Sequence, residues 1–114
     1  MNRTLGLIVL ALAFGAPASA QQAAKAGNAE AAKVKVSMCV GCHGIPDYRT
    51  AFPSVYHVPK IAGQSADYIA AALNAYRTGE RLHPSMQGIA KSLSEQDIAD
   101  LAAYYSAAAG GASR

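Results

Sequence analysis

The residues best suited to chemistry are the two cysteines of the chain and the histidine that follows them. Cys39, Cys42 and His43 stand together in the stretch SMCVGCHG, and the chain has no other cysteine. Thiolates are nucleophiles and metal ligands, and a neutral imidazole is a common metal ligand. Three kinds of site use such a group: a redox-active dithiol, part of a zinc site, and the covalent attachment of haem through Cys-x-x-Cys-His.

The surroundings of the cysteine pair do not favour the first two kinds of site. A reactive dithiol needs a lowered thiol pKa, which a helix N-terminus supplies, and its motif normally follows a β-strand. Here the pair follows a predicted helix, whose C-terminal dipole has the opposite sign. Structural zinc takes four ligands, usually as two separated pairs, whereas this chain offers one pair and two scattered histidines, His57 and His83. A plain disulfide between Cys39 and Cys42 is a further alternative, but so short a loop would contribute little stability.

Haem attachment would use all three residues at once. The two thiols would add to the two vinyl groups of one porphyrin, and His43 would bind the iron as an axial ligand. A covalent haem would also supply the core of a small chain, because small domains often depend on a disulfide, a metal or a cofactor. The motif therefore predicts one covalent haem c with its iron.

The N-terminus independently predicts export, and bacteria attach haem c outside the cytoplasm. Arg3 supplies a positive charge, residues 5–14 an apolar run, and residues 18–20 a small-residue cleavage site. We therefore expect a signal peptide over residues 1–20, a location in the periplasm, and one domain over residues 21–114. An uncleaved membrane anchor is the alternative, although the apolar run is shorter than the roughly 20 residues that a spanning helix needs.

The net charge of the expected mature chain is small. The sequence has ten Lys and Arg residues against seven Asp and Glu residues, and the signal peptide takes away one Arg, which leaves a net charge of +2. No cluster of basic residues resembles one that follows a phosphate backbone, so nucleic acid is not expected as a partner. An acidic protein surface is compatible with this charge.

The rest of the chain shows helical patterns and one long loop. Apolar residues at helical spacing predict three main helices, and serines at N-cap positions begin two of them. A single helical turn is expected between Pro84 and the last helix, and no β-strand has a signal of comparable strength. The predicted fold class is all-α, with three main helices and loops wrapped around one haem. The long loop fits this prediction, because a loop of more than about 15 residues usually has a function, and wrapping a cofactor would be one. The expected helices cover residues 21–38, residues 66–78 and the stretch from Ser94 to Gly110, and the expected loop covers residues 44–64.

The second axial ligand of a haem iron decides what the iron can do. An open face permits ligand binding or peroxidase chemistry, whereas a thioether or a second imidazole closes it. Met86, His83 and His57 are the candidates in this chain. His57 is expected at the surface, since histidine is often only partly buried, and Met86 could from its type alone be a packing residue of the core.

Three stretches of the sequence, taken together, resemble a known family. They are CVGCHG, VPKIAGQSADYIAAALNAYRTGER and HPSMQGIAKSLSEQDIADLAAYYS. They are similar to segments of class I c-type cytochromes, in particular the small bacterial periplasmic type that also forms the domains of dihaem cytochrome c-four. The resemblance covers residues 28–107 and implies the class I cytochrome c fold.

The resemblance also implies roles for particular residues. Cys39 and Cys42 would carry the thioether bonds of haem c, and His43 would be the proximal iron ligand. Met86, in the loop before the last helix, would be the distal ligand. The backbone carbonyl of Pro59 would accept a hydrogen bond from His43 and fix its orientation. Three further residues match positions often found near the haem or its propionates: Gln64, Tyr68 and Arg81.

Such a centre is suited to electron transfer. Iron held by a histidine and a methionine changes its geometry little between oxidation states, and the thioether favours the ferrous form. We therefore expect a monomeric electron carrier without enzymatic activity, whose partners are redox proteins of a respiratory chain: a membrane complex, a dehydrogenase, an oxidase or a reductase. Docking of the carrier on these partners should weaken as the salt concentration rises. Two alternatives are a dedicated haem subunit of a dehydrogenase complex and a haem sensor or peroxidase with a labile sixth ligand, at which His83 could compete.

Overall fold

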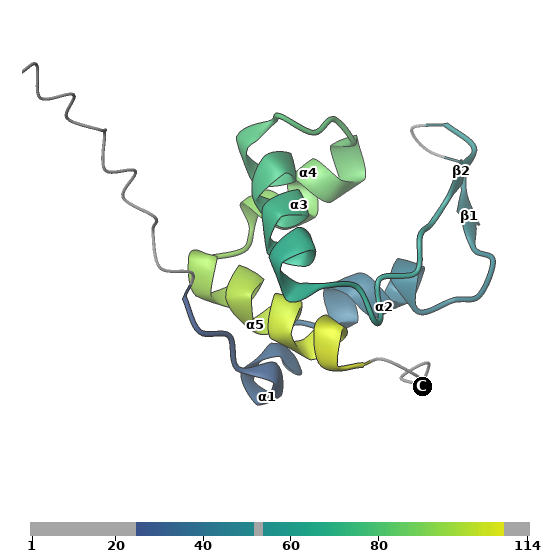
Figure 1. The fold of residues 1–114 in the computed structure, drawn as a ribbon. Coiled ribbons are helices and arrows are strands. Elements are labelled where there is room, and N and C mark those ends of the chain that lie inside the picture. The colour runs from purple at the N-terminus through teal and green to yellow at the C-terminus, as the bar shows by residue number, and fades with distance from the viewer. Residues whose placement is uncertain (1–24, 52–53, 109–114) are drawn as a thin grey trace, which may run out of the picture.

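The computed structural model describes residues 25–51 and 54–108, and these residues form helices and one short hairpin (Figure 1). The predicted all-α fold class is confirmed. The expected signal peptide over residues 1–20 lies outside the described residues. Within the described ranges, no helix combines the length and hydropathy needed to cross a membrane. The elements are α1 (Ala29–Ala32), α2 (Ser37–His43), β1 (Arg49–Thr50), β2 (Tyr56–His57), α3 (Ala66–Thr78), α4 (Pro84–Lys91) and α5 (Glu95–Ala107).

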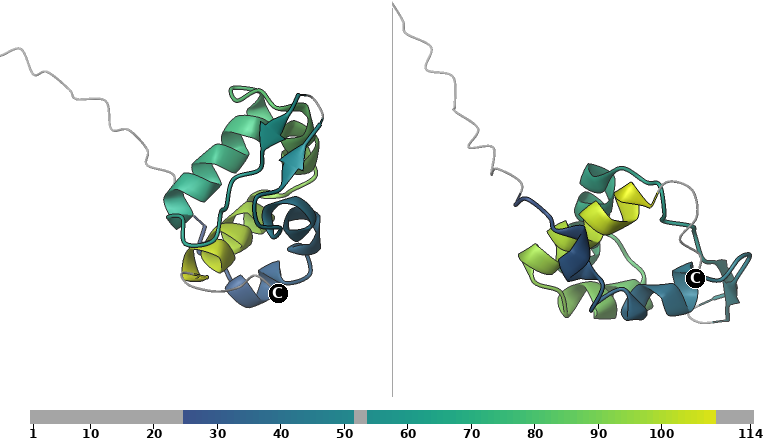
Figure 2. Two further views of the ribbon diagram at one scale, coloured as in Figure 1. Left: turned by 90° about the vertical axis from the view of Figure 1, so that its right-hand side faces the viewer. Right: turned by 90° about the horizontal axis from the view of Figure 1, so that it is seen from below.

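Helix α5 lies at the centre of the packing. Helix α1 lies against one side of it, α3 crosses another side, and α4 packs on α3 (Figures 1 and 2). Ile98 and Leu101 of α5 are the largest side chains that are fully buried in the described part of the chain. The apolar core is therefore small and lies on the α1–α5–α3 side of the molecule. Its buried members are Ala32, Ile69, Ala90, Leu93, Ile98, Leu101, Ala102 and Tyr105.

The segment that leads into α1 is fixed to α5 by a close backbone approach and by hydrogen bonds. A Cβ atom at Gly27 would overlap the carbonyl group of Ala99, so the contact requires glycine. The carboxylate of Asp100 is 7% exposed and accepts a hydrogen bond of 2.7 Å from the backbone N–H of Asn28. It accepts a second bond of 2.8 Å from the side-chain amide of Gln96. The first and last helices are thus joined although they lie far apart in the sequence.

The two long helices begin and end at residues that the sequence marks. The hydroxyl of Ser65 caps α3 by accepting a hydrogen bond of 3.2 Å from an N–H of the first turn. Gly79 ends α3 in the left-handed conformation, with φ of 87°. Ser94 and Asp97 form a capping box at the start of α5, with bonds of 3.1 and 2.9 Å. Both predicted helices are confirmed.

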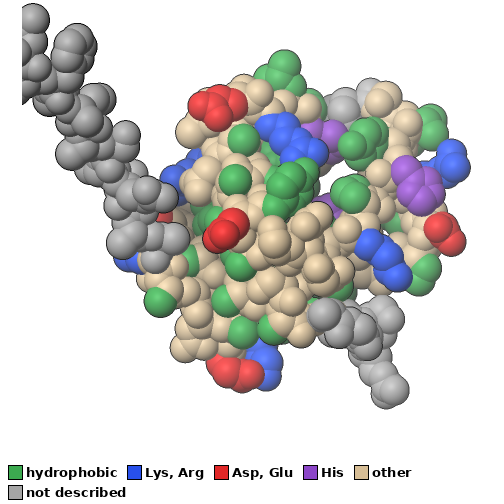
Figure 3. All heavy atoms as spheres, in the orientation of Figure 1, with side chains coloured by type: hydrophobic (Ala, Val, Ile, Leu, Met, Phe, Trp, Pro, Cys, Tyr) green, Lys and Arg blue, Asp and Glu red, His purple; other side chains and the backbone are tan. Residues whose placement is uncertain are grey.

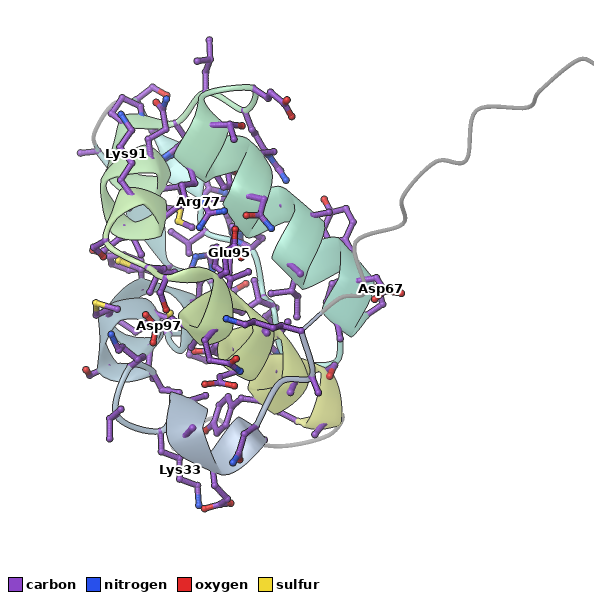
Figure 4. The ribbon with its side chains drawn as sticks, turned by 90° about the vertical axis from the view of Figure 1, so that its left-hand side faces the viewer. Lys33, Asp67, Arg77, Lys91, Glu95 and Asp97 are labelled. Carbon is purple, nitrogen blue, oxygen red and sulfur yellow. The ribbon has the colours of Figure 1, made fainter. Side chains whose placement is uncertain are left out.

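Ion pairs connect α5 to α3 and to the turn that precedes α2. Arg77 of α3 points toward Glu95 of α5, with 3.8 Å between the charged atoms (Figure 4). Lys35 lies 3.3 Å from the carboxylate of Asp97. Hydrogen bonds from the backbone N–H and hydroxyl of Ser94, and then the contact with Lys35, hold the pKa of Asp97 below its usual value.

The expected first helix is interrupted. Helices α1 and α2 replace the described part of the helix predicted over residues 21–38, and a turn at residues 33–36 separates them. The cysteine pair therefore lies inside α2 and not behind a longer helix, which corrects the prediction. Apolar residues keep helical spacing through the turn, so the pattern could not reveal the break.

The structure places Met86 in a helix and not in the loop that was expected before the last helix. Pro84 is the first residue of α4, His83 is its N-cap, and Met86 is its third residue. A proline at the first helical position lacks the N–H that would be unpaired there, and its fixed φ suits the helix. The single turn expected here is therefore a helix of eight residues.

A hairpin forms within the expected loop over residues 44–64, where no strand was predicted. Arg49 pairs with His57 and Thr50 with Tyr56 in antiparallel register. Strands of two residues are too short to show the alternation by which strands are recognised. The hairpin projects beside α2, away from the α1–α5–α3 core (Figure 1).

Candidate functional site

A cavity of about 300 Å³ opens between the helices and the hairpin. Figure 3 shows the molecule hollowed on this side, with basic side chains at the margin. Its wall is mostly apolar and aromatic, and among the described residues that border it there is no Asp or Glu. The residues that border it include the five expected to bind the haem or to orient its ligand, Cys39, Cys42, His43, Pro59 and Met86, and the three expected near the haem, Gln64, Tyr68 and Arg81.

Helix α2 brings both thiols and the imidazole to the cavity wall. Cys42 is exposed and Cys39 is partly buried, and both thiols are free. Burial raises the pKa of the Cys39 thiol, and the neighbouring hydroxyl of Tyr105 acts in the opposite direction. The Nδ1 atom of His43 lies 2.7 Å from the carbonyl oxygen of Pro59. When Nδ1 donates to this carbonyl, Nε2 carries the lone pair and is the nitrogen able to bind a metal.

Helix α4 brings Met86 to the same cavity. The backbone N–H of Met86 donates a hydrogen bond of 3.4 Å to Nδ1 of His83, which precedes the helix. The ring of His83 also meets the ring of Tyr56 edge to face, with 5.4 Å between the centroids. The partly buried Met86 thus offers the cavity a soft sulfur ligand from an element other than α2.

Among the described residues, two basic side chains border the cavity, Lys60 and Arg81. The guanidinium of Arg81 donates a hydrogen bond of 3.4 Å to the hydroxyl of Tyr68, and its Cζ lies 4.8 Å from the ring centre of Tyr76. The two tyrosines therefore hold this cation at the margin. A bound group that carries carboxylates would find opposite charges here. Gln64 borders the cavity as well.

Two hydroxyl groups on the cavity wall are buried without a hydrogen-bond partner among the described residues, those of Thr50 and Tyr105. Burial holds the pKa of Tyr105 well above its usual value, so the group stays a neutral donor. An unpaired buried hydroxyl costs about 1–3 kcal/mol. The wall is therefore suited to a large apolar group that carries hydrogen-bond acceptors of its own. A haem, with its flat apolar ring, two carboxylates and iron, has these properties.

The remaining histidine does not join the site. His57 is exposed on β2 and does not border the cavity, as expected for a surface histidine. Residues 25–51 and 54–108 contain no group of three or more His, Cys, Asp or Glu side chains that could hold a metal ion.

Some residues at the cavity have no counterpart among those predicted from the sequence. Thr50 lies on the hairpin, which no sequence pattern marks. Tyr105 is buried in the core and also borders the cavity. Lys60 directly follows Pro59, and this position was the one signal that could have identified it.

Comparison with known proteins identifies what this cavity belongs to. Residues 28–107 match the family model of cytochrome c. The chain belongs to the cytochrome c family. It is 43% identical over 84 residues to cytochrome c-554(548) of Halomonas halodenitrificans. The matched segment covers 71% of this chain and 96% of that protein.

Longer relatives match one part of their length. Cytochrome c4 of Pseudomonas aeruginosa is 35% identical over 105 residues, 92% of this chain and 48% of that protein. A thiosulfate dehydrogenase electron acceptor of Thiomonas intermedia is 34% identical over 107 residues, 93% of this chain and 44% of that protein. The chain therefore spans about half the length of these two relatives.

Membership of the cytochrome c family confirms the resemblance and the cofactor that the Cys-x-x-Cys-His motif predicts. Cytochromes c carry a covalently bound haem c with iron and transfer electrons. The redox-active dithiol and the zinc site are thereby set aside as explanations of the cysteine pair.

Proposed function

We propose that this cytochrome c is a periplasmic carrier of single electrons between respiratory redox proteins, through a haem c bound by Cys39 and Cys42 and ligated by His43 and Met86. The observation that supports this most is that one cavity is bordered by all four side chains, three from α2 and one from α4. The export pattern over residues 1–20 supports the location in the periplasm.

The two proposed ligands are held by different means. When bound, haem supplies a ferric–ferrous couple that takes up and releases one electron. The carbonyl of Pro59 accepts a hydrogen bond from Nδ1 of His43, which stops rotation of the ring and makes Nε2 a stronger ligand. Met86 lies in the first turn of α4, which Pro84 and His83 start. Because both ligands belong to helices, their positions need to change little between oxidation states.

We expect no substrate reaction at the iron. With Met86 in the sixth position, no coordination position is open for a substrate. Carboxylates that could act as general acid or base are absent from the described part of the cavity wall. His83 borders the cavity, but its Nδ1 is engaged by the N–H of Met86.

The name of one relative indicates a kind of partner. The thiosulfate dehydrogenase electron acceptor of Thiomonas intermedia makes a dehydrogenase a reasonable electron donor. A dedicated acceptor bound to one dehydrogenase is therefore a second candidate function. Gel filtration of native periplasm separates the two, since a free carrier elutes at its own size.

Lys60 and Arg81 at the cavity margin favour an acidic partner surface, so electron-transfer rates should fall as ionic strength rises. Rates that are flat with ionic strength would contradict such docking.

Optical spectra of the purified holoprotein test the proposed ligands. One haem should stay on the chain after acid extraction, and replacing Cys39 and Cys42 by alanine should release it. The oxidised protein should show the weak red iron–sulfur band, which Met86→Leu should abolish while lowering the reduction potential. Met38→Leu is the matched control, because Met38 does not border the cavity. A wild-type protein that lacks the red band and binds carbon monoxide rapidly when reduced would support a sensor or peroxidase instead.

A further inference from the structure

His83 contacts both the proposed distal ligand and the hairpin. Its backbone is extended, with φ of −165° and ψ of 108°, immediately before Pro84. Its Nδ1 atom accepts a hydrogen bond of 3.4 Å from the backbone N–H of Met86. His83 therefore occupies the N-cap position of α4, where Ser, Thr, Asp or Asn is usual.

Tyr56 of β2 contacts the ring of His83. The two ring planes are inclined by 61° with 5.4 Å between the centroids, which is the edge-to-face arrangement that aromatic pairs prefer. The hairpin that carries Tyr56 is closed by its strand pairing and by a hydrogen bond of 2.9 Å from the N–H of Val58 to the carbonyl of Tyr48. The imidazole thus has one contact to α4 and one to a separate element of the fold.

We propose that His83 is a positioning residue for Met86, with its imidazole kept in one orientation by Tyr56. The inference rests on the proposed function, since it takes Met86 as the distal iron ligand. The first N–H groups of a helix have no partner inside the helix, so the first turn frays when its cap is lost. Met86 belongs to that turn. The cap therefore limits how often the thioether leaves the iron.

The same contacts disfavour His83 as a competing iron ligand. A ring turned toward the iron would lose the hydrogen bond with the N–H of Met86 and the contact with Tyr56 together. His83 therefore supports Met86 as the iron ligand and does not replace it.

The experiment measures how often the sixth position opens in the oxidised holoprotein, with imidazole as the external ligand. The apparent affinity for imidazole rises in proportion to the fraction of molecules in which Met86 has left the iron. His83→Ala should raise this affinity about five-fold, the factor that corresponds to the free energy lost when a typical side-chain N-cap is removed. His83→Asn keeps a side-chain acceptor and should stay within about two-fold of wild type. Tyr56→Ala should raise the affinity about two-fold, and Tyr56→Phe, which keeps the ring, should leave it unchanged.

Ser94→Ala is the matched control, because it removes the cap of α5, a helix that carries no proposed ligand. It should lower the urea midpoint of unfolding about as much as His83→Ala does. Its affinity for imidazole should equal that of wild type. The comparison separates the positioning of Met86 from a general loss of stability.

The outcomes distinguish this inference from the proposed function. If His83→Ala binds imidazole no more tightly than Ser94→Ala or His83→Asn, the positioning role is wrong while the red iron–sulfur band still supports Met86. If the wild type has no red band and Met86→Leu leaves its spectrum unchanged, the proposed ligand is wrong and the positioning role with it. Should His83→Ala fail to fold, Tyr56→Ala and Tyr56→Phe decide, since Tyr56 is 44% exposed. Equal imidazole affinities in these two variants would overturn the inference.

Discussion

The buried carboxylate of Asp100 is expected to hold the N-terminal segment on α5, and its removal should cost much of the stability. Its bond from the N–H of Asn28, at 2.7 Å, is a hydrogen bond to a charged group, a kind that contributes about 1.5–3 kcal/mol. The bond from Gln96, at 2.8 Å, adds less, about 0.5–1 kcal/mol, because the amide of Gln96 also reaches the carbonyl of Ala26. We therefore expect Asp100→Ala to lower the free energy of unfolding by about 2–4 kcal/mol.

Urea unfolding of the holoprotein, followed by far-ultraviolet circular dichroism, measures this change. The loss should be equal in the oxidised and reduced forms, since Asp100 does not border the cavity. Glu95→Ala is the control, because its side chain is 73% exposed and lies 3.8 Å from Arg77. An exposed pair of this kind contributes less than about 1 kcal/mol. If Asp100→Ala costs no more than Glu95→Ala, the carboxylate does not anchor the segment.

Three further predictions concern other contacts. Gly27→Ala should lower the free energy of unfolding by about 1–3 kcal/mol, because its Cβ would overlap Ala99. In the same urea titration, Gly88→Ala should raise the free energy of unfolding by about 0.5–1 kcal/mol, because its Cβ would meet open space. Equal effects of the two substitutions would contradict the close approach of Gly27 to Ala99. Hydrogen bonds from Ser94 lower the pKa of native Asp97, so wild type should lose stability as the pH falls from about 4, the ordinary carboxylate value, through that lower pKa. Asp97→Asn should lack this part of the pH dependence between pH 5 and pH 2, and parallel curves for the two proteins would show that the capping box does not titrate. Tyr105→Phe should destabilise the holoprotein toward heat by about 1 kcal/mol, because the buried hydroxyl has no partner among the described residues and would donate a hydrogen bond to the bound haem. Unchanged or increased stability would show that the hydroxyl stays unpaired.

The features that the sequence predicts are those that depend on neighbours along the chain. Cys-x-x-Cys-His identifies the cofactor because its three functional residues act from one short segment. Ser65 and Ser94 mark helix starts because an N-cap bonds to an N–H two or three residues later. Gly79 marks a helix end because the left-handed conformation favours glycine. These local interactions need no knowledge of the rest of the fold.

The features that the sequence does not predict depend on contacts between distant segments or on very short elements. The turn between α1 and α2 interrupts a helical pattern that continues through it. Helix α4 has only eight residues, and a histidine in place of a serine begins it. Thr50 and Tyr105 reach one cavity from a hairpin and from the last helix. No pattern along the chain connects them, because tertiary packing alone brings them together.

Helix α2 combines the proposed haem-binding residues with little protection by the protein itself. None of its seven residues is fully buried, and the thiol of Cys42 is exposed. An enzyme that adds haem would therefore meet the thiol of Cys42 at the surface, whereas Cys39 is partly buried against the core. Until that addition, α2 and the hairpin have few buried groups to resist proteases. The amount of this protein in a cell is thus expected to follow the supply of haem, because molecules left without it are degraded first.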